Sequence, residues 1–285
     1  MVAATGTDGT VTVREAVDAV RRRIARLDAR LLVQHIVGIG HAEFLAHPER
    51  RLSHDEANAF MALVNRRANG EPLAYLTGER EFFGRSFAVT ADVLIPRPDT
   101  ERLVLAAIEV AEERGGEAAI LDLGTGSGAI AVTLALELPG ARLTATDLSA
   151  AALTVAGRNA AVLGATVSFV ASDWYAALGP TQFDLIVSNP PYVAAGDPHL
   201  AQDGLPFEPD LALTDGGDGL ACLREIIAGA PAFLAPGGQL LLEHGYDQAA
   251  AVRALLARAG FIAIASRRDL SGHERVSGGR WQPPA

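Results

Sequence analysis

The tetrapeptide Asn189-Pro190-Pro191-Tyr192 combines residue types that suit chemistry on a planar nitrogen. The two prolines fix two φ angles and remove two backbone donors, so the turn is stiff and its carbonyl oxygens stay free to accept hydrogen bonds. The nitrogen of an amide or arylamine is a poor nucleophile because its lone pair is delocalised. If the Asn189 side-chain oxygen and the Pro190 carbonyl each accept one N–H, the NH2 group is held with its remaining electron density pointing at an electrophile. Tyr192 offers an aromatic surface on which the planar group can pack.

The same turn favours a transition state in which a methyl group arrives at the nitrogen. Positive charge grows on the nitrogen during the transfer, so both acceptors bind its N–H groups more strongly in the transition state than before it. No dedicated general base is required, because the proton becomes acidic once the methyl group is attached. The sequence therefore predicts Asn189, Pro190 and Tyr192 as catalytic residues and Asn189, Pro190, Pro191 and Tyr192 as the substrate-binding residues.

A glycine-rich loop, Asp122-Leu123-Gly124-Thr125-Gly126-Ser127-Gly128, follows an apolar run and precedes a helical stretch. Glycines permit a tight turn and a close approach to a ligand, and we expect the amides at the helix start to face that ligand. Asp147 ends the next apolar run, where a carboxylate can accept both hydroxyls of a ribose. The expected cofactor-binding residues are Gly124, Thr125, Gly126, Ser127, Gly128, Asp147 and Asn189.

The loop by itself does not identify the cofactor. The series Gly124-x-Gly126-x-x-Ala129 also satisfies the dinucleotide pattern of proteins that bind NAD or FAD. Two details favour S-adenosylmethionine (SAM). Asp122 brings a negative charge that suits a cationic donor and repels a pyrophosphate. The third glycine, Gly128, makes the loop similar to the Gly-x-Gly-x-Gly loop of SAM-dependent methyltransferases.

Short apolar runs alternate with helical stretches from Ala118 onward, which predicts an α/β fold with a mostly parallel sheet covered on both faces. The C-terminal ends of such strands share one edge, where ligands bind. With Glu274-Arg275-Val276 as a final strand, we expect seven strands in a Rossmann-like methyltransferase domain. The other expected strands are Ala118–Leu123, Arg142–Asp147, Thr166–Val170, Phe183–Ser188, Gly238–Glu243 and Phe261–Ala265, and the expected helices are Ile130–Leu138, Ala150–Leu163, Leu220–Leu234 and Gln248–Ala259.

The first part of the chain has a different pattern, typical of a small helical bundle. Thr12 with Glu15 and Ser53 with Glu56 each fit a capping box at the start of a helix. Behind the first box, apolar residues recur at steps of three and four, which predicts one helical face that runs without a break; its residues are Val17, Val20, Ile24, Leu27 and Leu31. Behind the second, the same spacing joins Ala57, Phe60, Met61 and Val64.

The segment between these parts is rich in β-favouring residues from Phe82 to Ile95, with Gly84 among them, and predicts a β-hairpin. Pro96-Arg97-Pro98-Asp99 then forms a stiff extended stretch before a helix that begins near Asp99. We therefore expect three parts: a helical bundle for substrate recognition at 1–78, a hairpin and extended connector at 79–97, and a SAM-dependent methyltransferase catalytic domain at 98–285.

Composition narrows the class of protein. The net charge is −10, which argues against a chain that grips nucleic acid through its phosphates. A single cysteine, the lack of a secretion-signal pattern and the lack of a long apolar run lead us to expect a cytoplasmic protein with no membrane contact. The histidines are scattered, so no metal site is expected. We interpret Cys222 as a small core residue and His244 as structural, whereas Arg97 and Glu101 either hold the domains together or touch substrate.

Together, these residues resemble the bacterial HemK-type family, the N5-glutamine methyltransferases of peptide chain release factors. The resemblance covers nearly the whole chain, and the segment from Pro96 to Glu101 is its most discriminating part. It also includes Glu71–Gly78, Leu94–Ile95, Asp173-Trp174, Phe207-Glu208-Pro209 and Leu242-Glu243-His244-Gly245. The resemblance implies that SAM lies on Gly124–Gly128 with Trp174 close to its adenine. It also implies that the turn at Asn189 grips the glutamine of a Gly-Gly-Gln loop, and that the helical block touches the rest of the release factor.

Two other functions remain open from the residues alone. An adenine-N6 methyltransferase acting on DNA or RNA would present the same kind of planar NH2 group to Asn189, but it needs a positively charged face and a target-recognition region. A binding module that senses an adenosine cofactor without chemistry would have no use for the Asn189-Pro190-Pro191-Tyr192 turn.

Overall fold

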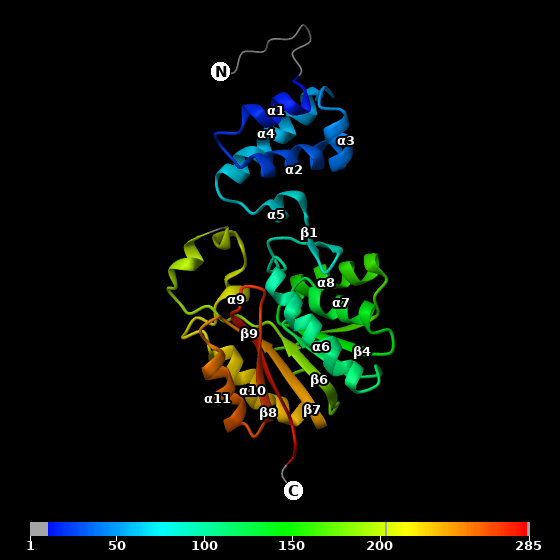
Figure 1. The fold of residues 1–285 in the computed structure, drawn as a ribbon, viewed down its shortest axis with the longest axis vertical. Helices are drawn as coiled ribbons and strands as arrows, with labels where there is room; N and C mark the ends of the chain where they lie inside the picture. Colours follow the sequence, from blue (N-terminus) through cyan, green and yellow to red (C-terminus); the bar gives the residue numbers. More distant parts are fainter. Residues whose placement is uncertain (1–10, 203, 284–285) are drawn as a thin grey trace. The chain divides into compact units, whose positions relative to one another are not determined.

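The computed structural model of the chain describes residues 11–202 and 204–283. The chain divides into two compact units, and the division falls between Gly78 and Glu79. The smaller unit is entirely helical in its described part, whereas the larger unit contains every strand of the described chain (Figure 1).

The smaller unit is built from short helices around one apolar core. Its elements are α1 (Val13–Ala19), α2 (Arg26–Val37), α3 (His41–Ala46), α4 (His54–Ala68) and α5 (Leu73–Thr77). Both predicted capping boxes are confirmed: the Thr12 hydroxyl accepts from the Glu15 amide and the Ser53 hydroxyl from the Glu56 amide, while each glutamate side chain bonds back to the cap residue. Each box satisfies amides that have no partner within the helix.

The prediction of one unbroken helical face from Val17 to Leu31 is wrong. The first helix ends at Ala19, and a turn separates it from α2. The reason is a change of phase: α2 buries Ala29, Leu32 and Val33, so Leu27 is exposed and Leu31 only half-buried. A continuous helix cannot present both sets of side chains to one core, and the turn reorients the chain between them. Met61 is likewise exposed, although Phe60 and Val64 are buried as expected.

The predicted hairpin is confirmed and belongs to the larger unit. Strands β1 (Glu79–Phe82) and β2 (Arg85–Ala88) pair antiparallel, and Gly84 lies between them with a φ of +72° that glycine tolerates best. Phe82 and Phe87 are buried in the same core as the sheet's first covering helices. Asn159 of α8 (Ala150–Leu163) holds the hairpin in place, because its Oδ1 accepts from the Ala88 amide at 2.8 Å and its Nδ2 donates to the Ala88 carbonyl at 3.0 Å.

The larger unit contains the expected seven-stranded, mostly parallel sheet, in the order β5-β4-β3-β6-β7-β9-β8 (Figure 1). All neighbouring pairs from β5 to β7 are parallel, and β9 runs antiparallel to both β7 and β8. The strands are β3 (Ala119–Leu123), β4 (Arg142–Asp147), β5 (Val167–Ala171), β6 (Phe183–Ser188), β7 (Leu234–Glu243), β8 (Ile262–Arg268) and β9 (Glu274–Arg280).

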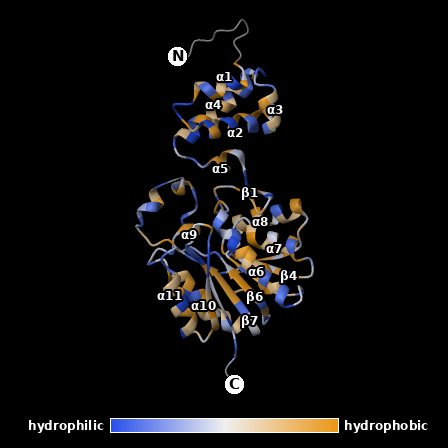
Figure 2. Cartoon of the chain, in the orientation of Figure 1, coloured by the Kyte–Doolittle hydropathy of each residue, from blue (hydrophilic) through white to orange (hydrophobic). Residues whose placement is uncertain are grey.

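Helices cover both faces of this sheet. One face packs against α6, α7 and α8, and the other packs against α10 and α11. Alternate residues of β3 enter the two cores, Ile120 on the first side and Leu121 on the second. Figure 2 shows β6 as strongly hydrophobic, as expected for a strand buried on both faces. The helices are α6 (Glu101–Glu113), α7 (Ala129–Glu137), α8 (Ala150–Leu163), α10 (Ala221–Phe233) and α11 (Ala249–Arg258).

The parallel pairing brings the two predicted functional motifs to the same edge of the sheet. Leu123, the last residue of β3, is paired with Ser188, the last residue of β6, and with Thr146 of β4. The Ser188 hydroxyl also donates to the Leu123 carbonyl at 2.7 Å. The glycine loop that follows β3 and the Asn189 turn that follows β6 therefore leave the sheet side by side.

Asn159 offers a test of how the hairpin is fixed. Its side chain is buried and bonds both backbone groups of Ala88 and the Ser127 carbonyl. Asn159→Ala leaves these buried groups without partners, so we expect the free energy of unfolding to fall by about 3 kcal/mol in urea titrations. The exposed Asn58→Ala in α4 is the matched control and should leave stability nearly unchanged. A loss in Asn159→Ala no larger than in the control would contradict this role.

Candidate active site

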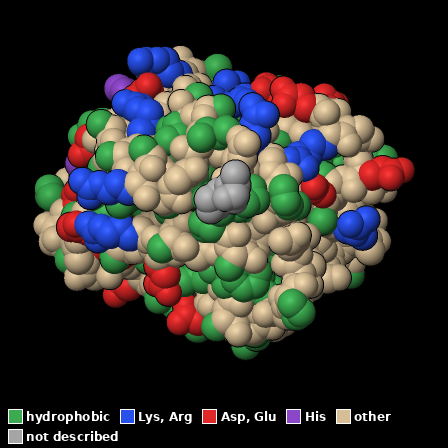
Figure 3. Space-filling view, turned by 90° about the horizontal axis from the view of Figure 1, so that it is seen from below, with side chains coloured by type: hydrophobic (Ala, Val, Ile, Leu, Met, Phe, Trp, Pro, Cys, Tyr) green, Lys and Arg blue, Asp and Glu red, His purple; other side chains and the backbone are tan. Residues whose placement is uncertain are grey.

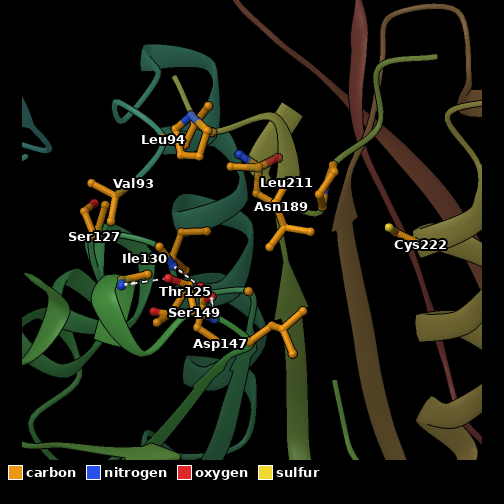
Figure 4. A pocket seen from close by; sticks show the side chains of 18 of the residues that line it. Val93, Leu94, Thr125, Ser127, Ile130, Asp147, Ser149, Asn189, Leu211 and Cys222 are labelled. Carbon is orange, nitrogen blue, oxygen red and sulfur yellow. Dashed lines mark hydrogen bonds between the residues drawn. The ribbon is translucent and has the colours of Figure 1, made fainter. Parts of the chain in front are cut away.

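A cavity of about 300 Å³ lies at the C-terminal edge of the sheet in the larger unit, at the small end of the volumes usual for ligand sites. It brings together the glycine loop, Asp147, Trp174, Asn189 and Pro191. Figure 4 shows side chains from separate segments around it, with Asp147 and Ser149 on one side and Asn189 and Leu211 on another. Further lining residues are Asp92, Val93, Leu94, Arg97, Thr100, Leu148, Asp173, Asp215 and Cys222.

The glycines of the loop serve conformation and close packing. Gly124, Gly126 and Gly128 have φ angles of +72°, +56° and +81°, which L side chains rarely adopt. A Cβ at Gly128 would lie 3.0 Å from the Cβ of Ala156, so α7 and α8 pack closely there. At Gly124 the same addition would lie 3.5 Å from the Trp174 ring, which places Trp174 over the loop.

The expectation that the loop amides face the ligand is corrected for four of them. Gly124 and Thr125 both donate their amides to the Thr146 carbonyl at 2.9 Å, and the Gly128 amide donates to the Thr125 carbonyl. The Gly126 amide donates to Asp147 Oδ2 at 2.8 Å. These bonds fix the conformation of the loop but leave it fewer amides that could donate to a ligand. Binding of a ligand here would therefore depend more on the room that the glycines leave and on side-chain acceptors.

Asp147 ends β4 and lies half-buried in the cavity wall. Its two oxygens each accept one backbone amide, Oδ2 from Gly126 and Oδ1 from Ser149, both at 2.8 Å. These bonds fix the carboxylate rigidly, and each oxygen keeps lone pairs for further donors. The geometry suits an acceptor of hydroxyl groups.

Asp122 lies behind the loop rather than in the cavity wall. It is fully buried, its Oδ2 accepts from the Thr125 hydroxyl at 2.7 Å, and its Oδ1 has no partner in the described part of the chain. Burial raises the pKa of Asp122 to about 7, the Thr125 bond opposes this and the Asp147 charge adds to it. The Asp122 carboxyl group therefore titrates near neutral pH. The negative charge that the sequence led us to expect on it is only partly present at that pH.

The Asn189 turn begins directly at the end of β6. The Asn189 Nδ2 donates to the Thr100 hydroxyl at 3.2 Å, and among the described residues no donor bonds its Oδ1. Pro190 is buried, and Asn189 and Pro191 line the cavity, whereas Tyr192 points elsewhere. The Tyr192 hydroxyl donates to Glu243 at 3.3 Å, and the backbone carbonyl of Tyr192 accepts from the Gln248 side chain. The pKa of Tyr192 is raised by its burial and by the negative charge of Glu243.

Sequence reasoning assigned no role in the site to several residues that shape it, although the segments that contain them carry the family resemblance. Thr100 is buried beside Asn189, and Glu243, at the end of β7, is buried beneath Tyr192. Glu208 is also buried, and it pairs with Arg97 at 2.5 Å and accepts from the Ile95 amide. A charged residue closes the apolar run of β7, and Thr100, Glu208 and Glu243 all lie in segments that carry the family resemblance, but neither signal identifies their partners. Nothing in the sequence pattern shows that Thr100, 89 positions before Asn189, is its partner.

The structure settles the contacts of four residues singled out in the sequence. Arg97 pairs with Glu208, and Glu101 accepts from the Phe83 amide at 3.0 Å, so both bind within the larger unit. His244 is fully buried, with its Nε2 2.7 Å from the Ser277 hydroxyl, as a structural role requires. The interpretation of Cys222 as a core residue is wrong: it is half-buried and lines the cavity (Figure 4). Its neighbours Leu223 and Ile226 take the core positions of α10 instead.

Comparison with known proteins identifies the family. A family model described as "Methyltransferase small domain" matches residues 100–204, and one described as "PrmC N-terminal domain" matches residues 13–78. The "Release factor glutamine methyltransferase" of Bordetella pertussis is 56% identical over 258 residues, which cover 90% of this chain and 95% of that protein. The chain belongs to the release factor glutamine methyltransferase family.

Solved structures of methyltransferases share the fold of this family member. The "hMettl16 catalytic domain in complex with MAT2A 3'UTR hairpin 6" matches with a TM-score of 0.54 and 19% identity, over 81% of this chain and 82% of that one. The Thermus thermophilus "16S rRNA N2 G1207 methyltransferase (RsmC) in complex with AdoMet and Guanosine" matches with a TM-score of 0.50 and 21% identity, over 72% and 50%. At these identities the likeness confirms the predicted Rossmann-like methyltransferase fold.

Asp122→Asn should change how stability depends on pH. The pKa of Asp122 is about 7 in the folded protein, against an ordinary value of about 4, so the folded protein keeps a proton that the unfolded chain has released between these pH values. The contribution of Asp122 to the free energy of unfolding is therefore complete at low pH and is lost as pH rises toward 7. In urea unfolding at about pH 5 and about pH 8, we expect the wild type to lose more stability with rising pH than Asp122→Asn.

The exposed Asp247→Asn is the matched control for this measurement and should behave like the wild type. Equal losses in the wild type and in Asp122→Asn would show that Asp122 is ionised normally in the folded protein.

Proposed function

We propose that the protein transfers a methyl group from SAM to the side-chain amide nitrogen (N5) of the glutamine in the Gly-Gly-Gln motif of peptide chain release factors. One observation carries this proposal: Asn189 lines the same cavity as the glycine loop, and the bond from its Nδ2 to Thr100 leaves its Oδ1 free to accept. The family to which the chain belongs supports the same substrate.

SAM supplies an electrophilic methyl group, and the residues around the cavity fit it. Trp174 over Gly124 offers a flat apolar surface for an adenine, and Asp147 offers fixed carboxylate oxygens for ribose hydroxyls. We assign the loop from Gly124 through Thr125, Gly126 and Ser127 to Gly128 as the support for the rest of the molecule.

The glutamine amide would be held by the Asn189 turn. Asn189 Oδ1 and the Pro190 carbonyl each accept one N–H, which orients the NH2 group and leaves its electron density directed at the methyl group. Both acceptors gain strength as positive charge develops on the nitrogen. Pro191 lines the cavity and Tyr192 anchors the turn through Glu243, so both keep the acceptors in place. The proton leaves after the transfer without a dedicated base.

The helical unit is the part we assign to recognition of the release factor. Its residues 13–78 match the "PrmC N-terminal domain", and the cavity residues all belong to the other unit. None of the helices that the structure describes is long and apolar enough to cross a membrane. We place the protein in the cytoplasm, where translation ends and where a single cysteine stays reduced.

An adenine-N6 methyltransferase is the alternative function, because adenine also presents a planar NH2 group. On the one face that Figure 3 shows, arginine side chains lie among acidic and apolar ones. The net charge of −10 disfavours this alternative function, because phosphate binding favours a basic surface. The observation that favours glutamine is the close likeness to release factor glutamine methyltransferases.

Transfer of label from methyl-labelled SAM tests the proposal directly. We expect a purified release factor to be labelled and a variant whose Gly-Gly-Gln glutamine is replaced to remain unlabelled, because the acceptor nitrogen is missing. DNA and RNA incubated in parallel with the enzyme should remain unlabelled. Labelling of nucleic acid without labelling of the release factor would overturn the proposal.

Asn189→Ala tests the acceptor that carries the mechanism. The substitution removes one hydrogen-bond acceptor that acts in the transition state, so we expect kcat to fall roughly a hundredfold or more. The affinity for SAM, measured by calorimetry, should change little because the glycine loop is intact. Asn58→Ala, on the exposed face of α4, is the control and should keep its rate. A near-normal kcat in Asn189→Ala would refute the role of Asn189.

A further inference from the structure

The side chain of Gln248 forms three hydrogen bonds to backbone groups of three separate segments. Its Nε2 donates to the Tyr192 carbonyl at 3.0 Å and to the Gly219 carbonyl at 3.1 Å. Its Oε1 accepts from the Gly245 amide, two residues after the end of β7, at 2.8 Å. Because the carbonyls can only accept and the backbone amide can only donate, these three partners fix the orientation of the Gln248 side chain.

Two of these bonds join the ends of one long segment. This wall segment, residues 193–218, begins directly after Tyr192 and ends directly before Gly219, so one NH2 group binds the residue on either side of it. Its two arms also lie side by side near these ends, because the Val193 and Ala195 amides donate across the segment to the Leu213 and Gly217 carbonyls. The residues that the wall segment contributes to the cavity lining are Pro209, Leu211, Ala212, Thr214 and Asp215.

Gly219 shows how closely the two ends approach each other. A Cβ at Gly219 would lie 2.5 Å from the Tyr192 carbonyl oxygen and 2.9 Å from Gln248 Nε2, both too close for real contacts. Its φ of +79° also favours glycine. Any side chain here would therefore have to displace the carbonyl of Tyr192 or break the bond that Gln248 donates to it.

The Asn189 turn depends on bonds at its two ends. Pro190 and Pro191 have no backbone N–H, so the middle of the turn cannot donate to its surroundings. At the first end, the Ser188 hydroxyl donates to the carbonyl of Leu123 in β3. At the second end, the backbone of Tyr192 is bound by Gln248. A shift of this second end would move the acceptors of the turn relative to the glycine loop.

We propose that Gln248 is a positioning residue that holds the second end of the Asn189 turn, so that Asn189 Oδ1 and the Pro190 carbonyl lie where the substrate nitrogen needs them. This inference rests on the proposed function, since it concerns the same site. The described residues that line the cavity do not include Gln248, so it acts through the turn and touches neither substrate nor SAM. Methyl transfer is sensitive to such a displacement, because a misplacement of about 1 Å can lower a rate on the order of a hundredfold.

Gln248→Met keeps the length of the side chain and removes its hydrogen bonds. We expect kcat at saturating SAM to fall roughly tenfold, because the turn is held less firmly. The dissociation constant for SAM, measured by calorimetry, should stay within about twofold, since Asp147 is fixed by other groups. Gln239→Met is the matched control and should keep its rate, because Gln239 is half-buried in β7 and its side chain bonds no described residue.

Gln248→Glu separates the donated bonds from packing. The glutamate side chain has nearly the same shape and keeps an oxygen for the Gly245 amide. An ionised carboxylate cannot donate, so it loses both bonds to the carbonyls of Tyr192 and Gly219. We expect kcat to fall at least as far as in Gln248→Met. A wild-type kcat in Gln248→Glu would show that the donated bonds are not needed and would overturn the proposal.

Gly219→Ala disturbs the same contact from the opposite side. Its matched control is Gly216→Ala, because Gly216 has a similar φ of +71° but a Cβ there would meet nothing within 4 Å. Both substitutions therefore strain the backbone, and only the one at Gly219 displaces the Tyr192 carbonyl. We expect kcat in Gly219→Ala to be roughly tenfold lower than in Gly216→Ala. Equal rates would count against the proposal.

Amide hydrogen exchange gives a second readout that needs no substrate. In Gln248→Met we expect the amides of Val193 and Ala195 to exchange roughly tenfold faster than in the wild type, because the ends of the wall segment separate more easily. The amides of Gly124 and Thr125, which bond the end of β4, should be unchanged. Faster exchange at both places would indicate a general loss of stability and would overturn the positioning role.

The outcomes separate this inference from the proposed function. If Gln248→Met methylates a release factor at the wild-type kcat, the positioning role is overturned and the proposed function stands. A loss of SAM affinity as large as the loss of kcat would also overturn that role, because the effect would then lie on the cavity as a whole. If the wild type methylates nucleic acid and no release factor, while Gln248→Met loses rate on that acceptor and exchanges faster at Val193, the positioning role is supported and the proposed function fails.

Discussion

The pairing of β3 with β6 is the interaction on which the site depends. These two strands are neighbours in the sheet, and their register pairs Leu123 with Ser188, although the two residues are 65 positions apart in the chain. Because both strands run in the same direction, the glycine loop and the Asn189 turn emerge at one edge. The Ser188 hydroxyl, which bonds the Leu123 carbonyl, holds the two exits together. A shift of the register by one residue would move the side chains of one strand to the opposite face and misalign the two motifs.

Two buried carboxyl groups flank this edge, one behind each motif. Asp122 lies behind the glycine loop and bonds the Thr125 hydroxyl, and Glu243 lies behind the Asn189 turn and bonds the Tyr192 hydroxyl. Burial raises the pKa of each to about 7, and each keeps one oxygen without a partner among the described residues. Such groups lower stability at neutral pH, which is the usual cost of polar groups that serve a site rather than the fold.

The segment from Ile95 to Glu101 forms hydrogen bonds with several separate parts of the larger unit. Its Ile95 amide and Arg97 side chain both bind Glu208, and its Thr100 hydroxyl accepts from Asn189. Glu101 accepts from the Phe83 amide at the hairpin turn. This short stretch therefore joins the hairpin, the Asn189 turn and the loop that contains Glu208. Its two prolines limit the conformations that the segment can adopt before folding, so ordering the segment costs less conformational entropy.

Periodicity and short-range motifs were enough to predict the α/β architecture, the glycine loop, the Asn189 turn and both capping boxes, because each depends on residues close together in the chain. They could not predict the break between α1 and α2, the exposure of Cys222 to the cavity, or the partners of Asn189 and Glu243. Those depend on which surfaces meet after folding: Thr100 and Asn189 are 89 positions apart, and Tyr192 and Glu243 are 51 apart. Only folding brings these groups within hydrogen-bonding distance. The orientation of the Asn189 amide, on which the proposed chemistry depends, is therefore decided by the tertiary structure.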